Sequence, residues 1–265
     1  MKITTLGSGS AFTLKNYQTS FLIETKEKKL LFDCGGDVRF ALRDIGLTYK
    51  DITDVYISHL HGDHVGGLEW LGFTKYFDPS QTRPKLYLSE VLLEDLWNKV
   101  LSGGMGSLQG KVAKLEDYFD VRPISLNGGF VVDTNKVDGT RFDLVQTVHI
   151  MNGYYIVPSF GLIMTGPGKW RTFITGDTQF APEQINSFYT MSDMIIHDTE
   201  YLYLPNGNPI FSTVHAHYEK LKELDASIKA KMWLCHYQDA VLEKDVMAEN
   251  DGFRGFLKKG QVLEL

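Results

Sequence analysis

The sequence has few of the features that mark secreted or membrane proteins. It contains only two cysteines, Cys34 and Cys235, among 265 residues. Two cysteines so far apart predict reduced thiols in the cytoplasm, not a disulfide framework. The first residues have too little apolar character for a secretory signal peptide. No apolar run approaches the roughly 20 residues that a membrane-spanning helix needs. We therefore expect a cytoplasmic protein without a membrane segment.

An excess of positive charge is also missing. The formal net charge is −6, so the chain as a whole does not attract a polyanion. This disfavours long nucleic acid as a substrate, although a local basic patch stays possible. Hydrophobic residues make up 43% of the chain, enough for a sizeable core. We find no repeat, low-complexity segment or linker, and we expect a single domain over residues 1–265.

Strand and helix patterns occur in both halves of the chain, which predicts an α/β fold. The expected strands are 1–6, 20–25, 29–32, 54–57, 85–88, 142–148, 171–175, 193–197 and 231–235, with further alternation through 129–165. The expected helices are 38–45, 68–77, 89–101 and 219–228. Residues 102–110 contain four glycines in nine positions. This composition predicts a mobile loop without regular structure, serving either as a lid or as a plain linker.

The densest cluster of side chains that can bind a metal follows the apolar run 55–57. His59, His61, Asp63 and His64 fall within six positions, which hold three of the chain's eight histidines. Imidazole and carboxylate are good ligands for zinc and similar ions, and catalytic sites often pair two such ions. A polar loop with chance histidines is the alternative, and this density disfavours it. The segment predicts a metal site.

These residues match the His-x-His-x-Asp-His signature of the metallo-β-lactamase fold hydrolases. The resemblance implies a four-layer αβ/βα sandwich with two metals at one edge of the sheets. It also implies a lone histidine, a bridging aspartate and a last histidine at later strand ends. His149, Asp177 and His236 follow predicted strands in this order. Taken alone, each would be an ordinary strand or turn residue.

The resemblance further implies how the ligands divide. His59, His61 and His149 would hold one ion, and Asp63, His64 and His236 the other. Asp177 and a water would bridge them. Zinc is the expected ion, with manganese as the alternative. Two divalent ions would activate the bridging water near neutral pH. The family also makes Asp33 an acceptor that orients a ligand histidine, although Asp33 could be a turn residue.

Two later segments resemble the tRNA 3′-processing endonuclease RNase Z. In 193–199, Asp198 replaces the glutamate of the RNase Z motif, and 214–218 lies where that enzyme carries His-Ser-Thr. The resemblance implies that His215, oriented by Asp198, protonates the leaving alkoxide or binds the phosphate. Asp63, which supports a full second metal, completes the candidate catalytic set. His217 is a candidate for substrate binding, or else belongs to a solvated helix start. His197 is expected to be structural.

The chain departs from RNase Z, since it lacks the His-Ser-Thr and the basic tRNA-gripping arm. It resembles the anti-Pycsar phosphodiesterases of phages and bacteria in its length and in the order of its motifs. The resemblance extends to three local sequences, Gly-Leu-Glu-Trp, Val-His-Ala-His-Tyr and Met-Trp-Leu-Cys-His-Tyr-Gln-Asp. That family degrades cyclic mononucleotide signals. The resemblance implies a homodimer in which a lid of one protomer helps to close the other's pocket. Tyr118 is the candidate lid residue, or an ordinary aromatic. An RNase Z-like RNA-processing enzyme and a metal-dependent ligand sponge without turnover are the alternatives.

Overall fold

The structure is a computed structural model that describes residues 1–25, 27–132 and 139–265. The first of its two large sheets has the strand order β16-β1-β2-β3-β4-β5-β8. Its strands are β1 (Lys2–Gly7), β2 (Ser20–Glu24), β3 (Lys29–Phe32), β4 (Asp54–Ile57), β5 (Lys85–Ser89), β8 (Asp120–Ile124) and β16 (Val262–Glu264). The pairs from β16 to β3 are antiparallel, and those from β3 to β8 are parallel.

The second sheet has the order β15-β14-β13-β12-β11-β10-β9. Its strands are β9 (Gly129–Val131), β10 (Arg141–Met151), β11 (Ile156–Thr165), β12 (Arg171–Ile174), β13 (Met194–Asp198), β14 (Met232–Cys235) and β15 (Gly255–Phe256). Strands β12 to β15 run parallel, and β9 to β12 antiparallel. Of the predicted stretch 129–165, residues 133–138 lie outside the described residues.

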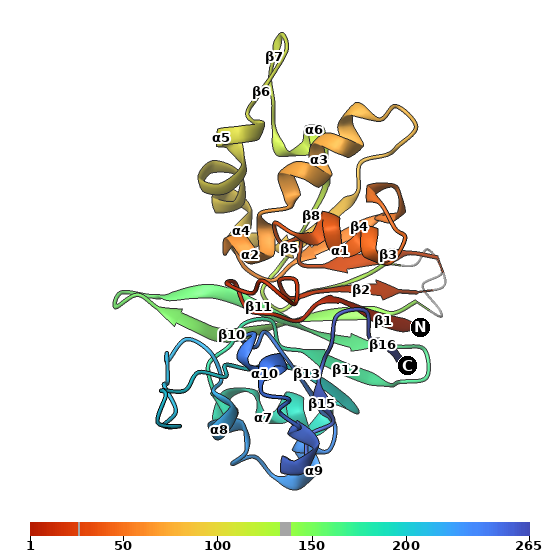
Figure 1. Cartoon of the computed structure of the whole chain (residues 1–265). Helices are drawn as coiled ribbons and strands as arrows, with labels where there is room; N and C mark the ends of the chain where they lie inside the picture. Colours follow the sequence, from red (N-terminus) through yellow and green to blue (C-terminus); the bar gives the residue numbers. More distant parts are fainter. Residues whose placement is uncertain (26, 133–138) are drawn as a thin grey trace.

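Helices lie on the outer side of each sheet (Figure 1). Those of the first half of the chain are α1 (Val38–Asp44), η1 (Tyr49–Asp51), α2 (Gly62–Val65), α3 (Leu68–Phe77), α4 (Glu90–Asp95), η2 (Leu96–Leu101), α5 (Ser102–Met105) and α6 (Leu115–Tyr118). Those of the second half are α7 (Pro182–Met191), α8 (Tyr218–Leu221), α9 (Ala226–Lys229), α10 (Ala240–Glu243) and η3 (Ala248–Asp251). In the described parts of the chain, no helix combines the length and apolar character needed to cross a membrane.

The side chains of one strand alternate between two packing layers. In β2, Phe21 and Ile23 are buried against the second sheet, whereas Leu22 belongs to the cluster beneath the helices. In β13, Ile196 faces the first sheet and Ile195 packs with the helices of its own side. The layers are therefore helices, sheet, sheet and helices, the αβ/βα order expected from the signature.

The glycine-rich segment is the first place where the structure differs from the sequence prediction. Residues 102–110 are ordered into α5 and a small hairpin of β6 (Ser107–Leu108) and β7 (Lys111–Val112), which projects beyond the helices (Figure 1). The prediction that so many glycines exclude regular structure was wrong. A Cβ at Gly104 would require the Glu69 carboxylate to move, and Gly110 adopts a φ of 75° in the turn, a conformation that favours glycine.

The predicted helix 219–228 is the second difference. It divides into α8 and α9, because Asp225 is extended with ψ 143° and starts a new helix. Each is only four residues long, so the amphipathic pattern is satisfied by two short turns packed on the second sheet.

Candidate metal centre

The candidate ligands gather where strands of both sheets end. His59 and His61 follow β4, and Asp63 and His64 lie in the short helix α2. The others come from the second sheet: His149 in β10, Asp177 after β12 and His236 after β14. β4 belongs to the first sheet and β14 to the second, so residues 59 and 236 become neighbours because the two sheets pack face to face with these strand ends at the same edge.

Unusual backbone conformations orient two of the candidate ligands, His236 and His149, and also Asp33, which contacts the ligand His64. Asp33 and His236 have φ values of 59° and 63°, in the left-handed region that costs about 1–3 kcal/mol for such residues. The pairing of β10 with β11 shifts register between Val148 and Ile150, so His149 sits on a β-bulge within the strand, not at its end. Strain and bulges of this kind persist where the fold holds a side chain for function.

The first ligand group consists of His59, His61, His149 and Asp177, whose ligand atoms lie within 4.8 Å of one another. His61 Nδ1 is 3.0 Å from His59 Nε2 and 3.2 Å from His149 Nε2. Nitrogens at about 2.0–2.1 Å from a tetrahedral zinc lie about 3.3 Å apart, close to these separations. His149 Nδ1 donates to the Val214 carbonyl at 2.8 Å, which leaves the Nε2 lone pair for a metal.

The second group consists of Asp63, His64, Asp177 and His236, again within 4.8 Å. Among the described residues, the buried His64 Nε2 has no hydrogen-bond partner. It lies 3.1 Å from Asp63 Oδ2 and 3.3 Å from Asp177 Oδ2. An imidazole nitrogen buried between two carboxylates without a hydrogen bond fits a place for a cation.

Asp177 is the residue that both groups share. Its Oδ2 lies 3.6 Å from His59 Nε2, 3.3 Å from His64 Nε2, 3.6 Å from His149 Nε2 and 3.5 Å from His236 Nε2. One buried oxygen therefore faces imidazoles of both groups. This is the geometry that a bridging carboxylate requires, and the donor set fits a pair of divalent ions.

The surroundings favour neutral imidazoles at most ligand positions. Burial lowers the pKa of His59 and His61, and lowers the pKa of His149 and of His236 to about 4. Burial opposes the charge of Asp177, but the surrounding histidines outweigh it and hold its pKa well below the usual range. Neutral imidazole and ionised carboxylate are the forms that bind metal.

A second carboxylate–histidine pair lies beside the two groups. His215 Nδ1 is 2.8 Å from Asp198 Oδ2, and its ring centroid is 4.9 Å from that of His149 and 4.8 Å from that of His236. Burial disfavours the charged imidazole, but Asp198 outweighs it and raises the pKa of His215 to about 9. The backbone N–H of Thr178 donates to the same carboxylate oxygen at 2.9 Å. The pair is thus held in one orientation at the edge of the centre.

The whole chain can be compared with known proteins. It matches the family described as "Anti-Pycsar protein Apyc1" over residues 1–263. The chain belongs to this family. An Apyc1 protein of Paenibacillus harenae is 36% identical over 245 residues, covering 91% of each chain. One of Bacillus phage vB_BveM-Goe7 is 31% identical over 247 residues, again covering 91% of each.

Solved structures support the fold of this Apyc1 family member. The metallo-β-lactamase fold protein YhfI from Bacillus subtilis has a TM-score of 0.69 at 18% identity and covers 99% of both chains. The short form of human tRNase Z has a TM-score of 0.67 at 17% identity, and yeast PDE1 one of 0.71 at 13%; each covers 100% of this chain and is itself 99% covered. The prediction of a metallo-β-lactamase fold is confirmed.

Two residues predicted to contact substrate have other partners in this member of the Apyc1 family. His217 caps α8: its Nδ1 accepts from the Glu219 N–H at 3.1 Å, and its Nε2 donates to the Leu202 carbonyl at 3.0 Å. Its side chain is buried, and its ring packs beside Tyr203 and Phe211. Tyr118 is fully buried and donates to the Met105 carbonyl at 2.7 Å. A tyrosine packed in this way does not reach a ligand, so we do not retain Tyr118 as a lid residue.

His197 is structural, as expected for this Apyc1 chain. It is buried, with Nε2 2.5 Å from the Tyr189 hydroxyl and Nδ1 2.6 Å from the Asp198 carbonyl. Sequence reasoning missed Thr19, whose hydroxyl lies 3.2 Å from His236 Nδ1. A lone threonine after a loop carries no signal that would single it out.

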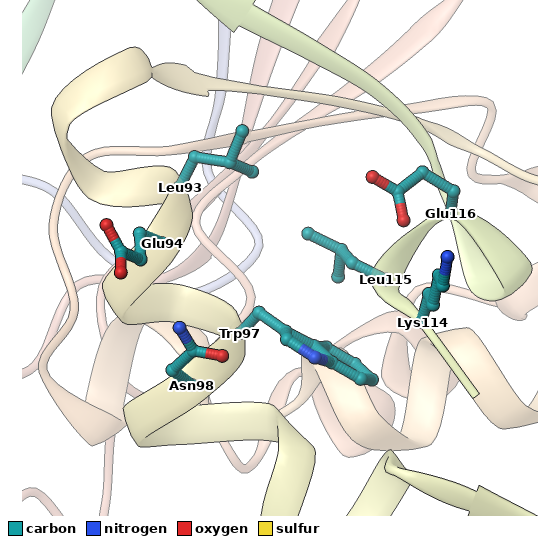
Figure 2. A pocket seen from close by; sticks show the side chains of 7 residues that line it. All are labelled: Leu93, Glu94, Trp97, Asn98, Lys114, Leu115 and Glu116. Carbon is teal, nitrogen blue, oxygen red and sulfur yellow. The ribbon is translucent and has the colours of Figure 1, made fainter. Parts of the chain in front are cut away.

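Sequence reasoning also missed the pockets near the metal centre. One of about 510 Å³ borders His59 and His61, and one of about 260 Å³ borders His215. A third, of about 340 Å³, lies between the α4–η2 segment and α6 and is lined by none of the candidate ligands (Figure 2). The Asn152-Gly153 pair is a hairpin signal that predicts the turn between β10 and β11, at the end of which Tyr155 lies.

Asp33 provides a direct test of how the second group is held. Its Oδ2 is 2.7 Å from His64 Nδ1, and its carboxylate accepts from the N–H and hydroxyl of Ser58 at 2.8 and 2.7 Å. Asp33→Asn keeps the side-chain shape and tolerates the left-handed backbone. We expect it to weaken metal binding by about 10- to 100-fold, the usual effect of removing the partner of a ligand histidine.

Competition with a chelator measures this affinity. Asp37→Asn is the matched control. Asp37 lies in the same loop, but its carboxylate accepts a hydrogen bond from the Gln18 N–H and does not contact a candidate ligand histidine. Unchanged affinity in Asp33→Asn would show that its contact does not orient His64.

Proposed function

We propose that this protein is a binuclear metal-dependent phosphodiesterase that hydrolyses 3′,5′-cyclic nucleotide monophosphates, such as cUMP, cCMP, cAMP and cGMP, to nucleoside monophosphates. By removing these signals it would counter Pycsar immunity in the cytoplasm. One observation carries the proposal: two ligand groups share the Asp177 carboxylate, with the His215–Asp198 pair at their side. Membership of the anti-Pycsar family supports the choice of substrate.

Each group of residues would hold one of the two metal ions. His59, His61 and His149 would hold one ion, Asp63, His64 and His236 the other, and Asp177 both. When bound, two zinc ions, or manganese in their place, activate a water and neutralise charge on the phosphoryl oxygens. Asp63 is essential here because it gives the second group a carboxylate of its own.

His215 serves the leaving group. Hydrolysis breaks one P–O bond, and the ribose oxygen that leaves must gain a proton because an alkoxide is a poor leaving group. Asp198 holds His215 by Nδ1, so Nε2 carries the proton that is transferred. The carboxylate also stabilises the imidazolium before transfer.

We also propose a homodimer, as the family resemblance implies, with a lid from one protomer over the other's pocket. Sedimentation of the purified protein tests the dimer directly. The β6–β7 hairpin projects from the body of the protomer, and we propose it as the candidate for this lid (Figure 1).

An RNase Z-like tRNA 3′-processing endonuclease is the second candidate. The His215–Asp198 pair favours it, because the RNase Z family uses a carboxylate–histidine couple at the scissile phosphate. The net charge of −6 weighs against it, since RNA binding depends on cationic contacts with phosphates.

A substrate panel separates the two. The protein is incubated with cyclic mononucleotides, cyclic dinucleotides and a 3′-extended pre-tRNA, and products are resolved by chromatography. We expect conversion of cyclic mononucleotides, which chelation of the metal abolishes. Cleavage of pre-tRNA with inert cyclic mononucleotides would reverse the ranking. Metal binding without turnover of any substrate would indicate a protein that binds its ligand without hydrolysing it.

A further inference from the structure

The pocket of about 510 Å³ opens directly from the metal centre, since His59 and His61 form part of its wall. The rest comes from α4 and η2 on one side and from the β10–β11 hairpin on the other. Most of its lining is apolar, contributed by Leu60, Val91, Leu92, Val100, Val157 and Pro158. A mainly apolar cavity of this size with a few polar groups is typical of a small-molecule site.

Tyr155 stands at this wall with its ring available. The side chain is 61% exposed, although large aromatic residues are usually buried. Its backbone is fixed: Asn152 Oδ1 accepts from the Tyr155 N–H at 3.2 Å, and the Tyr155 carbonyl accepts from the Asn152 N–H at 3.2 Å. A rigid, exposed aromatic loses little conformational entropy when it binds a ligand.

Two charged residues of the pocket form an ion pair. Lys99 donates to Asp95 Oδ2 at 2.7 Å, one helical turn apart. Asp95, Lys99 and Tyr155 all line this pocket. The ion pair offers an acceptor and a donor at the edge of whatever stacks on Tyr155.

We propose that this pocket binds the nucleobase of the substrate, with Tyr155 stacking on its face and the Asp95–Lys99 pair reading its edge. The inference rests on the proposed cyclic-nucleotide activity. The phosphate lies at the metal centre, and the base extends past His59 and His61 into the apolar cavity. Stacking accepts every base, whereas edge contacts discriminate among them.

The two charged groups favour different bases. The Asp95 carboxylate accepts from the C4 amino group of cytosine, and the Lys99 ammonium donates to the C4 oxygen of uracil. Asp95→Asn is therefore expected to lower kcat/KM for cCMP more than for cUMP. Lys99→Met is expected to shift the ranking the other way.

The decisive comparison is Tyr155→Ala against Tyr154→Ala. Tyr154 is 96% exposed and does not line the pocket, so it is a neighbour of the same type without the proposed role. We expect Tyr155→Ala to raise KM for cyclic nucleotides by about 10- to 100-fold, in line with a lost base stack, and Tyr155→Phe to restore it. Tyr154→Ala should match the parent protein.

A base-free ribose 3′,5′-cyclic phosphate completes the test. Tyr155→Ala should hydrolyse it as well as the parent does, because this probe has no base to stack. Equal KM values in Tyr155→Ala and Tyr154→Ala would overturn the inference, as would an equal loss on the base-free probe. A rise in KM in Phe211→Ala alone would place the base in the smaller pocket beside His215 instead. A parent protein inactive on every cyclic phosphate would refute the proposed function itself, before any variant is compared.

Discussion

Asp177→Ala is expected to lower phosphodiester hydrolysis by at least about 10³-fold and to release metal. The parent protein should contain about two divalent ions per chain, one for each ligand group. Asp177 supplies the one oxygen that faces histidines of both groups. Its loss removes a ligand and a negative charge from each ion. Metal ions contribute several kcal/mol of transition-state stabilisation, and each 1.36 kcal/mol is a tenfold change in rate.

One further variant separates the effect of charge from that of side-chain size, and a second serves as the control. Asp177→Asn keeps the size of the side chain and removes its charge, so it should lose nearly as much activity as the alanine variant. Asp225→Ala is the control, because Asp225 is exposed at the start of α9 and makes no side-chain capping bond with the described residues. Elemental analysis and initial rates are measured on the same preparations. An Asp177→Ala protein with full activity, or with two ions still bound, would contradict the binuclear mechanism.

His215→Ala is expected to slow hydrolysis of cyclic nucleotides by about 10²- to 10⁴-fold, the usual contribution of a positioned general acid. Both ions should remain, because His215 pairs with Asp198 and is not needed to complete either of the two ligand groups. Asp198→Asn should cause part of the same loss, since it orients His215 and stabilises its charge without transferring a proton.

The leaving group decides what His215 does. Bis-p-nitrophenyl phosphate releases a stable phenolate that needs little protonation, so the defect of His215→Ala should shrink on this substrate. Equal losses on both substrates would indicate that His215 binds the phosphate instead. His217→Asn keeps a capping side chain for α8 and serves as the comparison. Loss of metal from His215→Ala would assign His215 to the ligands.

The sequence was informative about the metal centre because its ligands follow apolar strands, and the hydrophobic pattern shows where strands end. His59, His61 and His236 could be placed in this way. His149 was expected at a strand end, but β10 continues to Met151 and a bulge turns the side chain. A bulge depends on the pairing with β11, which the pattern of one strand does not contain.

Other features depended on tertiary contacts. The glycine-rich segment is ordered by backbone hydrogen bonds from Gly106 to Ser102 and from Ala113 to Gly106, which composition alone does not reveal. The helix after Ser89 was expected, but its change to a π-helical turn over Leu96–Leu101 was not. Such turns are rare but occur frequently at functional sites. Lys99 of this turn lines the pocket beside His59, and Trp97 lines a separate pocket (Figure 2).

The shared position of the ligands between the two sheets has a thermodynamic consequence. His59 and His61 come from the first half of the chain and His149 from the second, and His64 and His236 divide in the same way. Each ion would therefore fasten one half of the molecule to the other. Free energy of metal binding then adds to the free energy of unfolding, by about 2.7 kcal/mol for an ion at 100 times its Kd. The free energy of unfolding would therefore rise and fall with the concentration of free metal in the surroundings.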